Sequence, residues 1–275
     1  MRGNLGAALF QIAIGIFAAA IFTAEGEPRR AFAPADPSNP LKYLIPGEEF
    51  LPPSIAAQQA DDFDNPAYAL VETGERAWSA PEGTLGKSCR SCHGLGNRNG
   101  VRQAAATYPK YVAGLKEVIT LTSRINLCRK GNLGADVLAE DSTPMLAMTA
   151  YLRWLARGTP ETVDKTGPAA ELFERGRTLY QTKQGLLQLS CAQCHHERFG
   201  QKFGGDSLSQ GHPVAYPAYK LDQQRVITLH ERFRMCNALV RGRGQPDGSD
   251  DYIALELFLN WRSRNLPITA PGVRP

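Results

Sequence analysis

The 275-residue sequence has little charge imbalance, few methionines (four) and histidines (five), and no long apolar run beyond its first 22 residues. Its 31 Lys and Arg nearly balance 27 Asp and Glu, which argues against nucleic-acid or membrane-surface binding. Residues 5–22 form an uncharged apolar segment behind Arg2, which predicts a signal peptide over residues 1–24 and no stable membrane insertion after its removal. An uncleaved anchor is the alternative, and Ala20 and Ala24 are both possible cleavage points.

Cysteine is also scarce, and all six cysteines belong to one repeated unit. A Cys-x-x-Cys-His run occurs at residues 89–93 and 191–195, and one lone cysteine follows each run, Cys128 and Cys236. This spacing is typical of c-type haem attachment, in which two thiols form thioethers and the histidine binds iron. Such attachment needs thiols handled outside the reducing cytosol, which predicts a periplasmic protein. We expect two covalently bound haem c groups, held by Cys89, Cys92, His93, Cys191, Cys194 and His195.

Both haem motifs lie within a longer internal repeat. Residues 118–121 recur at 226–229, a shift of 108 (226 minus 118), whereas Gly74 recurs as Gly176, a shift of 102 (176 minus 74). The second half has therefore gained six residues (108 minus 102) just after its haem motif. A duplicated domain is the simplest interpretation. Each half resembles the cytochrome c fold, in which a small residue on the first helix lets the last helix cross closely.

The predicted fold is all-α, with two tandem cytochrome c-like domains behind an extended N-terminal arm. The arm is rich in proline and lacks helical periodicity, whereas proline and glycine mark the ends of several amphipathic segments. We expect the arm at 25–65 and the domains at 66–160 and 168–275, joined by a linker at about 159–167. The first helix of each half is predicted at about 66–78 and 168–180, and the last at 143–158 and 251–261.

The sixth iron ligand decides what each haem can do. Met145 and Met148 follow the first motif at plausible distances, but the second half contains only Met235. Cys128 and Cys236 occupy the same place in the repeat, and a thiolate is a reasonable haem ligand, so we interpret both as iron ligands. A Cys128–Cys236 disulfide is the main alternative. His212 and His230 are weaker candidates.

Zinc binding and structural disulfides are other possible uses of the six cysteines. The two Cys-x-x-Cys pairs lie 102 residues apart (191 minus 89), and each is followed by histidine. Zinc sites built from such pairs have a much shorter separation, about 15 to 20 residues. Haem attachment therefore remains the favoured interpretation.

Arginine gathers near the second lone cysteine. Those within twelve residues of Cys236 are Arg225, Arg232, Arg234, Arg241 and Arg243, whereas the only arginines so near Cys128 are Arg124 and Arg129, with Lys130 beside them. Planar guanidinium groups bind doubly charged oxyanions through paired hydrogen bonds, and they lower the pKa of a nearby thiol. The second haem is therefore the predicted substrate site, and a basic face that meets a redox partner is the alternative.

Longer motifs make the interpretation more specific. They are Asn65-Pro66, GERAW at 74–78, GKSCRSCHG at 86–94, RINLCR at 124–129, RFRMCN at 232–237 and YIALELFLNWR at 252–262. With these segments, residues 60–270 or thereabouts resemble the SoxA family of the periplasmic sulfur-oxidising (Sox) system, in its dihaem form. Some relatives lack the first haem, but this chain retains all three of its attachment residues.

The resemblance implies an L-cysteine S-thiosulfotransferase. Such an enzyme joins thiosulfate oxidatively to a cysteine of the carrier SoxYZ and passes electrons to a monohaem cytochrome, SoxX, with which it forms a heterodimer. The resemblance also implies that Cys236, as a persulfide, ligates the second haem opposite His195, and that Arg232 faces the substrate, which makes Cys236 and Arg232 the predicted catalytic residues. Arg124 occupies the place of Arg232 in the first half, so a structural role for Arg232 is the alternative.

Two other functions remain open at the level of the sequence. A thiosulfate dehydrogenase, which couples two thiosulfates to tetrathionate, is also a dihaem cytochrome with a cysteine-ligated haem. A non-catalytic dihaem electron carrier would use the arginines near Cys236 as a docking face. Product analysis separates the first alternative, and turnover without a sulfur substrate separates the second.

Overall fold

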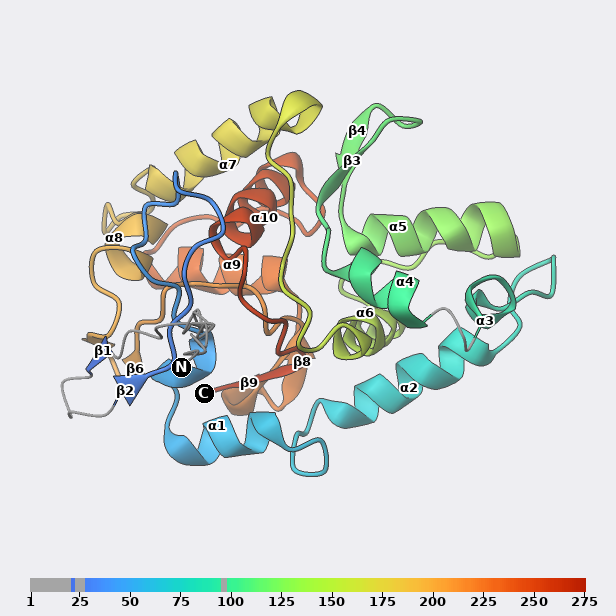
Figure 1. The fold of residues 1–275 in the computed structure, drawn as a ribbon, viewed down its shortest axis with the longest axis horizontal. Coiled ribbons are helices and arrows are strands. Elements are labelled where there is room, and N and C mark those ends of the chain that lie inside the picture. Colours follow the sequence, from blue (N-terminus) through green and yellow to red (C-terminus); the bar gives the residue numbers. More distant parts are fainter. Residues whose placement is uncertain (1–20, 23–27, 95–97) are drawn as a thin grey trace, which may run out of the picture.

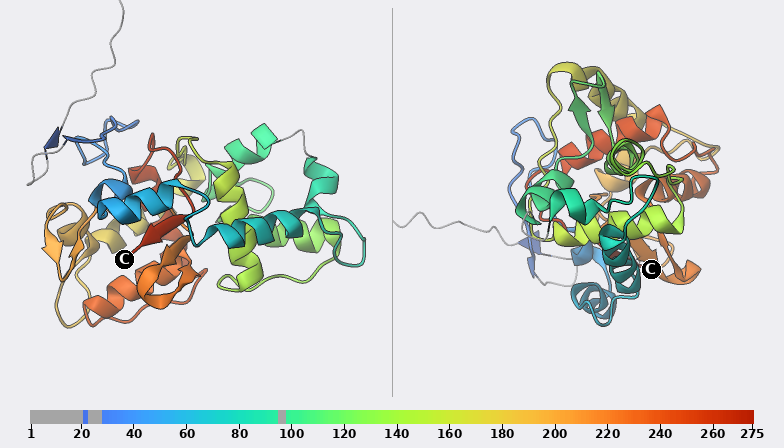
Figure 2. Two further views of the ribbon diagram at one scale, coloured as in Figure 1. Left: turned by 90° about the horizontal axis from the view of Figure 1, so that it is seen from below. Right: turned by 90° about the vertical axis from the view of Figure 1, so that its right-hand side faces the viewer.

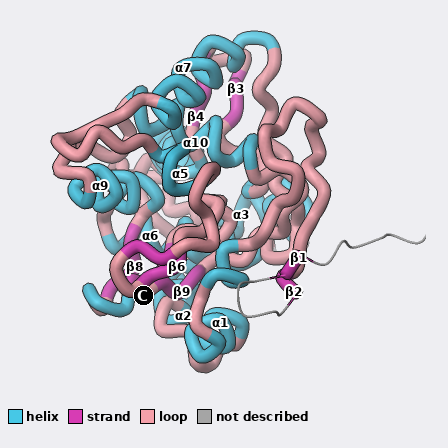
Figure 3. The backbone as a smooth tube through the Cα atoms, turned by 90° about the vertical axis from the view of Figure 1, so that its left-hand side faces the viewer, coloured by secondary structure: helices cyan, strands magenta, loops and turns pink. Residues whose placement is uncertain are grey.

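The computed structural model describes residues 21–22, 28–94 and 98–275, so the predicted signal peptide falls largely outside the described residues. The chain forms two mainly helical lobes that lie side by side (Figure 1). Helices and loops make up most of the backbone, and the strands are short (Figure 3). Within the described ranges, no helix combines the length and the apolar character needed to cross a membrane.

The first lobe contains the first haem motif and a short hairpin. Its helices are α2 (Tyr68–Ser79), α3 (Cys89–His93), α4 (Arg98–Ala105), α5 (Leu121–Cys128) and α6 (Thr143–Leu155). The hairpin pairs β3 (Lys110–Val112) with β4 (Glu117–Ile119), and a π-helical turn, η2 (Arg129–Leu133), continues α5.

The second lobe repeats this order. Its helices are α7 (Ala170–Gln181), α8 (Cys191–His195), α9 (Leu229–Leu239) and α10 (Asp250–Arg262), with 3-10 turns η3 (Gly167–Ala169) and η4 (Leu221–Gln223). Its strands are β5 (Lys202–Phe203), β6 (Asp206–Ser207), β7 (Ala218–Lys220) and β8 (Arg225–Ile227). The β5–β6 hairpin follows the second haem motif, where the repeat gains residues, and α4 takes that place in the first lobe. The predicted internal duplication is therefore visible in the order of the elements.

A glycine permits the closest helix crossing in each lobe. A Cβ atom built at Gly74 of α2 would lie 2.1 Å from the carbonyl oxygen of Ala147 in α6. The same atom at Gly176 of α7 would lie 2.0 Å from the carbonyl oxygen of Ala254 in α10. No side chain fits at such distances, so the predicted role of a small residue at the crossing is confirmed.

Apolar stripes and capping residues explain the terminal helices. Ser142 accepts a hydrogen bond from the backbone of Met145 at the start of α6, and a proline occupies the first turn. Met145 and Met148 are buried against Val71 of α2, and in α10 Leu257 and Trp261 are buried in the second core. The observed bounds agree with the predicted helices to within a few residues.

The N-terminal arm is not wholly extended, which corrects one expectation. Within the predicted bounds 25–65 it contains β2 (Pro28–Arg29), which pairs with β1 (Ile21–Phe22) just before the arm, the 3-10 turn η1 (Gly47–Phe50) and the helix α1 (Pro53–Ala60). Leu44 packs with Val214 and Leu266 of the second lobe. The backbone N–H of Val273 donates to Gln59 Oε1 at 3.1 Å, which joins α1 to β9 (Gly272–Arg274) (Figure 2). Tertiary contacts of this kind leave no local periodicity in the sequence.

The linker and the C-terminal tail run together between the lobes. The backbone N–H of Glu161 donates to the carbonyl of Leu266 at 3.0 Å, and that of Ile268 donates to the carbonyl of Thr159 at 3.0 Å. Strand β9 then pairs in parallel with β7, whose other edge pairs with β8. This small sheet is the main departure from an all-helical second lobe.

Candidate haem-binding and catalytic site

A capping box builds the short helix that carries the second haem motif. Ser190 Oγ accepts a hydrogen bond from the backbone N–H of Gln193 at 3.3 Å, and the Gln193 side chain accepts one from the Ser190 backbone at 2.9 Å. The resulting turn, α8, places Cys191 and Cys194 three residues apart on one face, with His195 next in the chain. Both cysteines are free thiols, which suits thioether formation with one haem.

The His195 ring has one nitrogen hydrogen-bonded and the other without a partner among the described residues. Its Nδ1 atom lies 2.8 Å from the carbonyl oxygen of Ser209, and a carbonyl only accepts, so Nδ1 carries the proton. Burial lowers the pKa of His195 to about 4, which keeps the ring neutral, and the Nε2 lone pair is left for a metal. Gly211 packs against this ring with φ +74°, and a Cβ there would lie 3.0 Å from His195 Cγ.

Cys236 lies close to the cysteines of the second haem motif. It sits in the last two turns of α9, a helix that begins where Thr228 accepts a hydrogen bond from the Glu231 backbone. Burial raises the pKa of the Cys191 thiol to about 12, and the nearby Cys236 thiol adds to that rise. Cys236 acts in the same direction on Cys194. The structure therefore brings together the predicted ligand and attachment residues of the second lobe.

The first lobe has the same plan with different surroundings. Ser88 and Ser91 form the capping box of α3, and burial raises the pKa of Cys89 to about 11, with further contributions from Glu82 and Cys128. The His93 ring lies 5.4 Å from the Trp78 ring, measured between centroids. None of the described residues accepts a hydrogen bond from His93, unlike His195. Each lone cysteine thus lies near the first cysteine of the motif in its own lobe and contributes to the raised pKa of that thiol.

Most arginines near Cys236 are already occupied or exposed. Arg225 forms an ion pair with Glu231, and Arg234 forms one with Asp247. Arg241 and Arg243 are exposed at the surface. The predicted cluster is therefore not one continuous anion site.

Arg232 differs from these arginines. Among the described residues, no hydrogen bond or ion pair to its guanidinium is seen, although the phenol of Tyr216, followed by the Cys236 thiol, raises its pKa against the effect of burial. Its counterpart Arg124 donates from Nε to the hydroxyl of Tyr108 at 3.1 Å. The same residue type thus binds a tyrosine in the first lobe and keeps free donors beside a cysteine in the second.

The two histidines considered as weaker ligands are engaged elsewhere. His230 Nε2 lies 3.0 Å from Glu256 Oε2, and its Nδ1 accepts from the backbone N–H of Gly248 at 3.0 Å, which leaves no free lone pair. His212 Nε2 lies 2.9 Å from Gln210 Oε1, on the side of the second motif that holds His195. His212 Nδ1 has no hydrogen-bond partner among the described residues, but its ring lies near His195 and Arg262.

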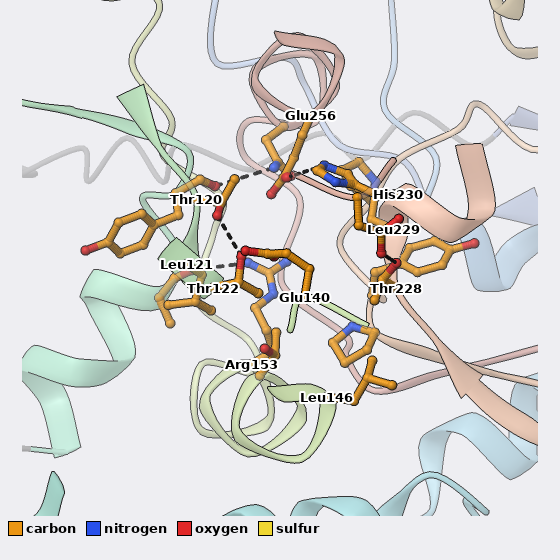
Figure 4. Close-up of a pocket in the computed structure, with 18 residues that line it drawn as sticks. Thr120, Leu121, Thr122, Glu140, Leu146, Arg153, Thr228, Leu229, His230 and Glu256 are labelled. Carbon is orange, nitrogen blue, oxygen red and sulfur yellow. Dashed lines mark hydrogen bonds and ion pairs between the residues drawn. The ribbon is translucent and has the colours of Figure 1, made fainter. Parts of the chain in front are cut away.

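A cavity of about 90 Å³ between the lobes was not predicted from the sequence. Corresponding residues of the two repeats line it, including Thr120 with Thr228 and Leu121 with Leu229. Figure 4 shows Glu140, His230 and Glu256 around this space, and none of the described residues that line it is a cysteine. The only sequence signal for this cavity is the repeat, because equivalent positions of two repeated lobes can meet at their boundary.

Comparisons with known proteins agree on one family. The family "SoxA/TsdA, cytochrome c domain" matches residues 73–160 and 175–268. The SoxA subunit of L-cysteine S-thiosulfotransferase from Rhodovulum sulfidophilum is 38% identical over 248 residues, which cover 89% of this chain and 85% of that protein. The corresponding subunit from Pseudaminobacter salicylatoxidans is 34% identical over 246 residues, with the same coverage of 89% and 85%.

The fold agrees with a solved relative over nearly its whole length. The crystal structure of SoxXA from P. pantotrophus superposes with a TM-score of 0.83 and 30% identity, covering 95% of this chain and 99% of that chain. Together with the duplicated cytochrome c domain, these similarities confirm the family expected from the motifs around Cys128 and Cys236. The chain therefore belongs to the SoxA family of L-cysteine S-thiosulfotransferase subunits.

Proposed function

We propose that this chain carries two covalently bound haem c groups and catalyses the oxidative conjugation of thiosulfate to a carrier cysteine. The attachment residues are Cys89 and Cys92 with His93, and Cys191 and Cys194 with His195. Support comes from the free thiols on one turn of each motif helix and from the neutral His195 ring with its available Nε2. Cys128 and Cys236 are the proposed sixth ligands because each lies beside the motif of its own lobe.

The proposed location follows from the haem chemistry. Residues 1–24 act as a signal peptide, and the mature protein works in the periplasm, because haem attachment of this type takes place outside the reducing cytosol. The arm spans 25–65, and the domains at 66–160 and 168–275 hold the first and second haem.

The reaction releases two electrons and one proton for each conjugate. A carrier thiol and thiosulfate give a carrier S-thiosulfonate, and the new bond joins the carrier sulfur to the outer, sulfane sulfur of thiosulfate. Bound haem would supply the electron acceptor. In this proposal Cys236 Sγ first forms the disulfide bond to the sulfane sulfur, and the carrier thiolate then attacks that sulfur and releases the Cys236 thiolate.

Arg232 is the main reason for placing this chemistry in the second lobe. It lies four residues before Cys236 on α9, so both side chains share one helix face, and its donors are free for an oxyanion. The sulfonate of thiosulfate is a matching partner, because it presents three oxygens to a planar, always charged fork. Arg124 differs, because its Nε already donates a hydrogen bond to the Tyr108 hydroxyl.

The proposed partners are a monohaem cytochrome of the SoxX type and the sulfur carrier SoxYZ. The solved relative is a SoxXA complex, and its SoxA-like chain is matched almost completely here. The monohaem protein would accept the electrons, and SoxYZ would supply the cysteine that receives thiosulfate.

Replacing Cys236 with Met tests the central step. In protein matured in a periplasm, Cys236→Met is expected to retain two haems by intact mass and to lose conjugation of thiosulfate to the carrier. Met235→Leu is the matched control, with wild-type conjugation expected. Wild-type turnover by the Cys236 variant would end the proposal, and tetrathionate as the product of the wild-type protein would favour a thiosulfate dehydrogenase instead.

Arg232→Gln tests the anion-binding role. Loss of a charge-assisted contact is expected to lower kcat/KM for thiosulfate by roughly tenfold to a hundredfold, because such bonds contribute about 1.5–3 kcal/mol. Arg124→Gln removes the equivalent charge from the first lobe and serves as the control. Equal effects of the two substitutions would point to a structural role shared by both arginines.

A further inference from the structure

Arg262, at the end of α10, is the most deeply buried charge of the second lobe that has no carboxylate partner. Its side chain is fully buried, with an exposed fraction of 0%. Its Nη2 donates to the carbonyl of His195 at 2.9 Å, its Nη1 donates to the carbonyl of Gln210, and its guanidinium carbon lies 5.2 Å from the centre of the Tyr180 ring. Among the described residues no acid forms an ion pair with it, so its burial costs free energy that this region does not offset by charge pairing.

The two carbonyl groups held by Arg262 belong to the segments that orient the proximal histidine. Arg262 binds the carbonyl of His195 on one side and that of Gln210 on the other. His195 Nδ1 donates to the carbonyl of Ser209, the residue directly before Gln210. The guanidinium therefore fixes the distance between His195 and the backbone segment whose carbonyl accepts its hydrogen bond.

The N-terminal arm supports the same arrangement from outside. Gln210 Oε1 accepts from the backbone N–H of Ile45 at 2.8 Å, and Gln210 Nε2 donates to the carbonyl of Tyr43 at 3.0 Å. Asn39 donates from Nδ2 to the carbonyl of Arg262 itself at 2.8 Å. The proximal side of the second motif is thus held by α10, the segment at Gln210 and the arm together.

The first lobe has no equivalent charge. The helices α6 and α10 align through their N-cap serines, Ser142 and Ser249, and this alignment places Leu155 where α10 has Arg262. The two proximal sides therefore differ by one positive charge and by the anchored hydrogen bond of the histidine.

We propose that Arg262 is a positioning residue that orients His195 and raises the reduction potential of the second haem through its buried positive charge. A cation in a medium of low polarity stabilises the reduced centre, which carries one more electron. A cysteine thiolate ligand pushes electron density toward iron and has the opposite effect. Arg262 offsets this at the haem that must accept electrons from the sulfur chemistry, whereas the first haem lacks such an offset. This inference rests on the proposed second haem.

The test compares midpoint potentials of both haems in mature holoprotein. Arg262→Gln and Arg262→Leu are expected to make reduction of the second haem roughly tenfold less favourable, about 59 mV for a one-electron couple, and to leave the first haem unchanged. Arg262→Lys keeps the charge without the fork, so at least half of that shift should be recovered. Arg177→Gln removes an exposed arginine paired with Glu174 and should shift neither potential.

The possible outcomes are separable. An unchanged potential of the second haem in Arg262→Gln, or a shift in Arg262→Lys as large as in Arg262→Gln, would overturn the role of the charge. Haem counts by intact mass accompany every potential. A wild-type protein without haem at residues 191–195 would instead overturn the proposed function, whatever Arg262 does. If the neutral variants fail to attach haem, the lysine variant alone decides. A second-haem potential that differs from the wild type by less than half of the tenfold shift supports the proposal, and a larger difference refutes it.

Discussion

Gly176 leaves no room for a side chain, because a Cβ atom there would lie 2.0 Å from the carbonyl oxygen of Ala254 and 3.0 Å from Phe258 Cβ. Gly176→Ala would therefore force α7 and α10 apart. We expect a loss of about 3 kcal/mol in the free energy of unfolding, the upper part of the range for overpacked cores. Urea unfolding of the holoprotein, followed by circular dichroism, measures this loss.

Gly114→Ala is the control for this substitution, because no atom lies within 4 Å of a Cβ at Gly114. It should change the free energy of unfolding by less than about 0.5 kcal/mol. Comparable stability of the two variants would mean that α7 and α10 can separate without cost, and the duplicated crossing would lose its structural explanation.

The Cys-x-x-Cys-His runs and the lone cysteines are visible in the sequence, but the electrostatics around them are not. The Cys-x-x-Cys-His spacing is fixed by the covalent chemistry of one haem, so it is visible locally. Arg262, by contrast, reads as an ordinary cation in the last turn of a helix. Its burial depends on Tyr180 and Gln210, which lie far away in the sequence. Likewise, only the structure shows that Glu231 and Asp247 occupy two of the arginines near Cys236.

At the scale of elements, the arm holds the end of α10 through Asp36. Trp261 Nε1 donates to Asp36 Oδ2 at 2.9 Å, and Lys165 Nζ lies 3.0 Å from the same oxygen. Hydrogen bonds from Ser38, Trp261 and Lys165 hold the pKa of Asp36 well below its usual range. A depressed carboxyl pKa stabilises the fold above the unfolded value, about 3.9, and this contribution disappears as the pH falls through the lower folded value.

Asp36→Asn is therefore expected to destabilise the protein by about 1 kcal/mol at pH 7, since the carboxylate is partly exposed to solvent. The difference from the wild type should shrink as the pH falls below about 4, because the Asp36 carboxyl of the unfolded wild-type chain begins to take up its proton while the folded one stays ionised. Unfolding in urea at pH 7 and pH 3 measures both values. A difference that is constant with pH would show that lost packing, and not the charge, is responsible. Asp64→Asn changes an exposed carboxylate and is the control.

The helices were easier to predict than the arm for a physical reason. Segments such as α6 and α10 carry a stripe of apolar residues and begin after a serine, which caps α6, and both features are local signals. The helix α1 is short, and its bonds run to β9 at the other end of the chain, so its sequence reads as a loop rich in proline. The small sheet of β7, β8 and β9 escaped prediction for the same reason.

At the scale of the whole molecule, the lobes are joined through a buried ion pair. Arg153 of α6 donates from Nη2 to Glu161 Oε1 in the linker at 2.5 Å, and from Nη1 to the carbonyl of Ala105 at 3.2 Å. The Glu161 side chain is fully buried, which raises the pKa of its carboxyl, while Arg153 opposes that rise. Since the same linker residue also bonds to the C-terminal tail, this pair fixes how the first lobe meets the second.

Glu161→Gln keeps the shape of the side chain and removes its charge, so Arg153 would remain buried without a counter-ion. We expect a loss of about 3 kcal/mol in the free energy of unfolding, because uncompensated buried charges are costly. The double variant Arg153→Met with Glu161→Leu removes both charges and should return to within about 1 kcal/mol of the wild type. Glu174→Gln, in the exposed pair with Arg177, should cost less than about 0.5 kcal/mol. A double variant no more stable than Glu161→Gln would place the loss in the packing of the linker and not in the isolated charge.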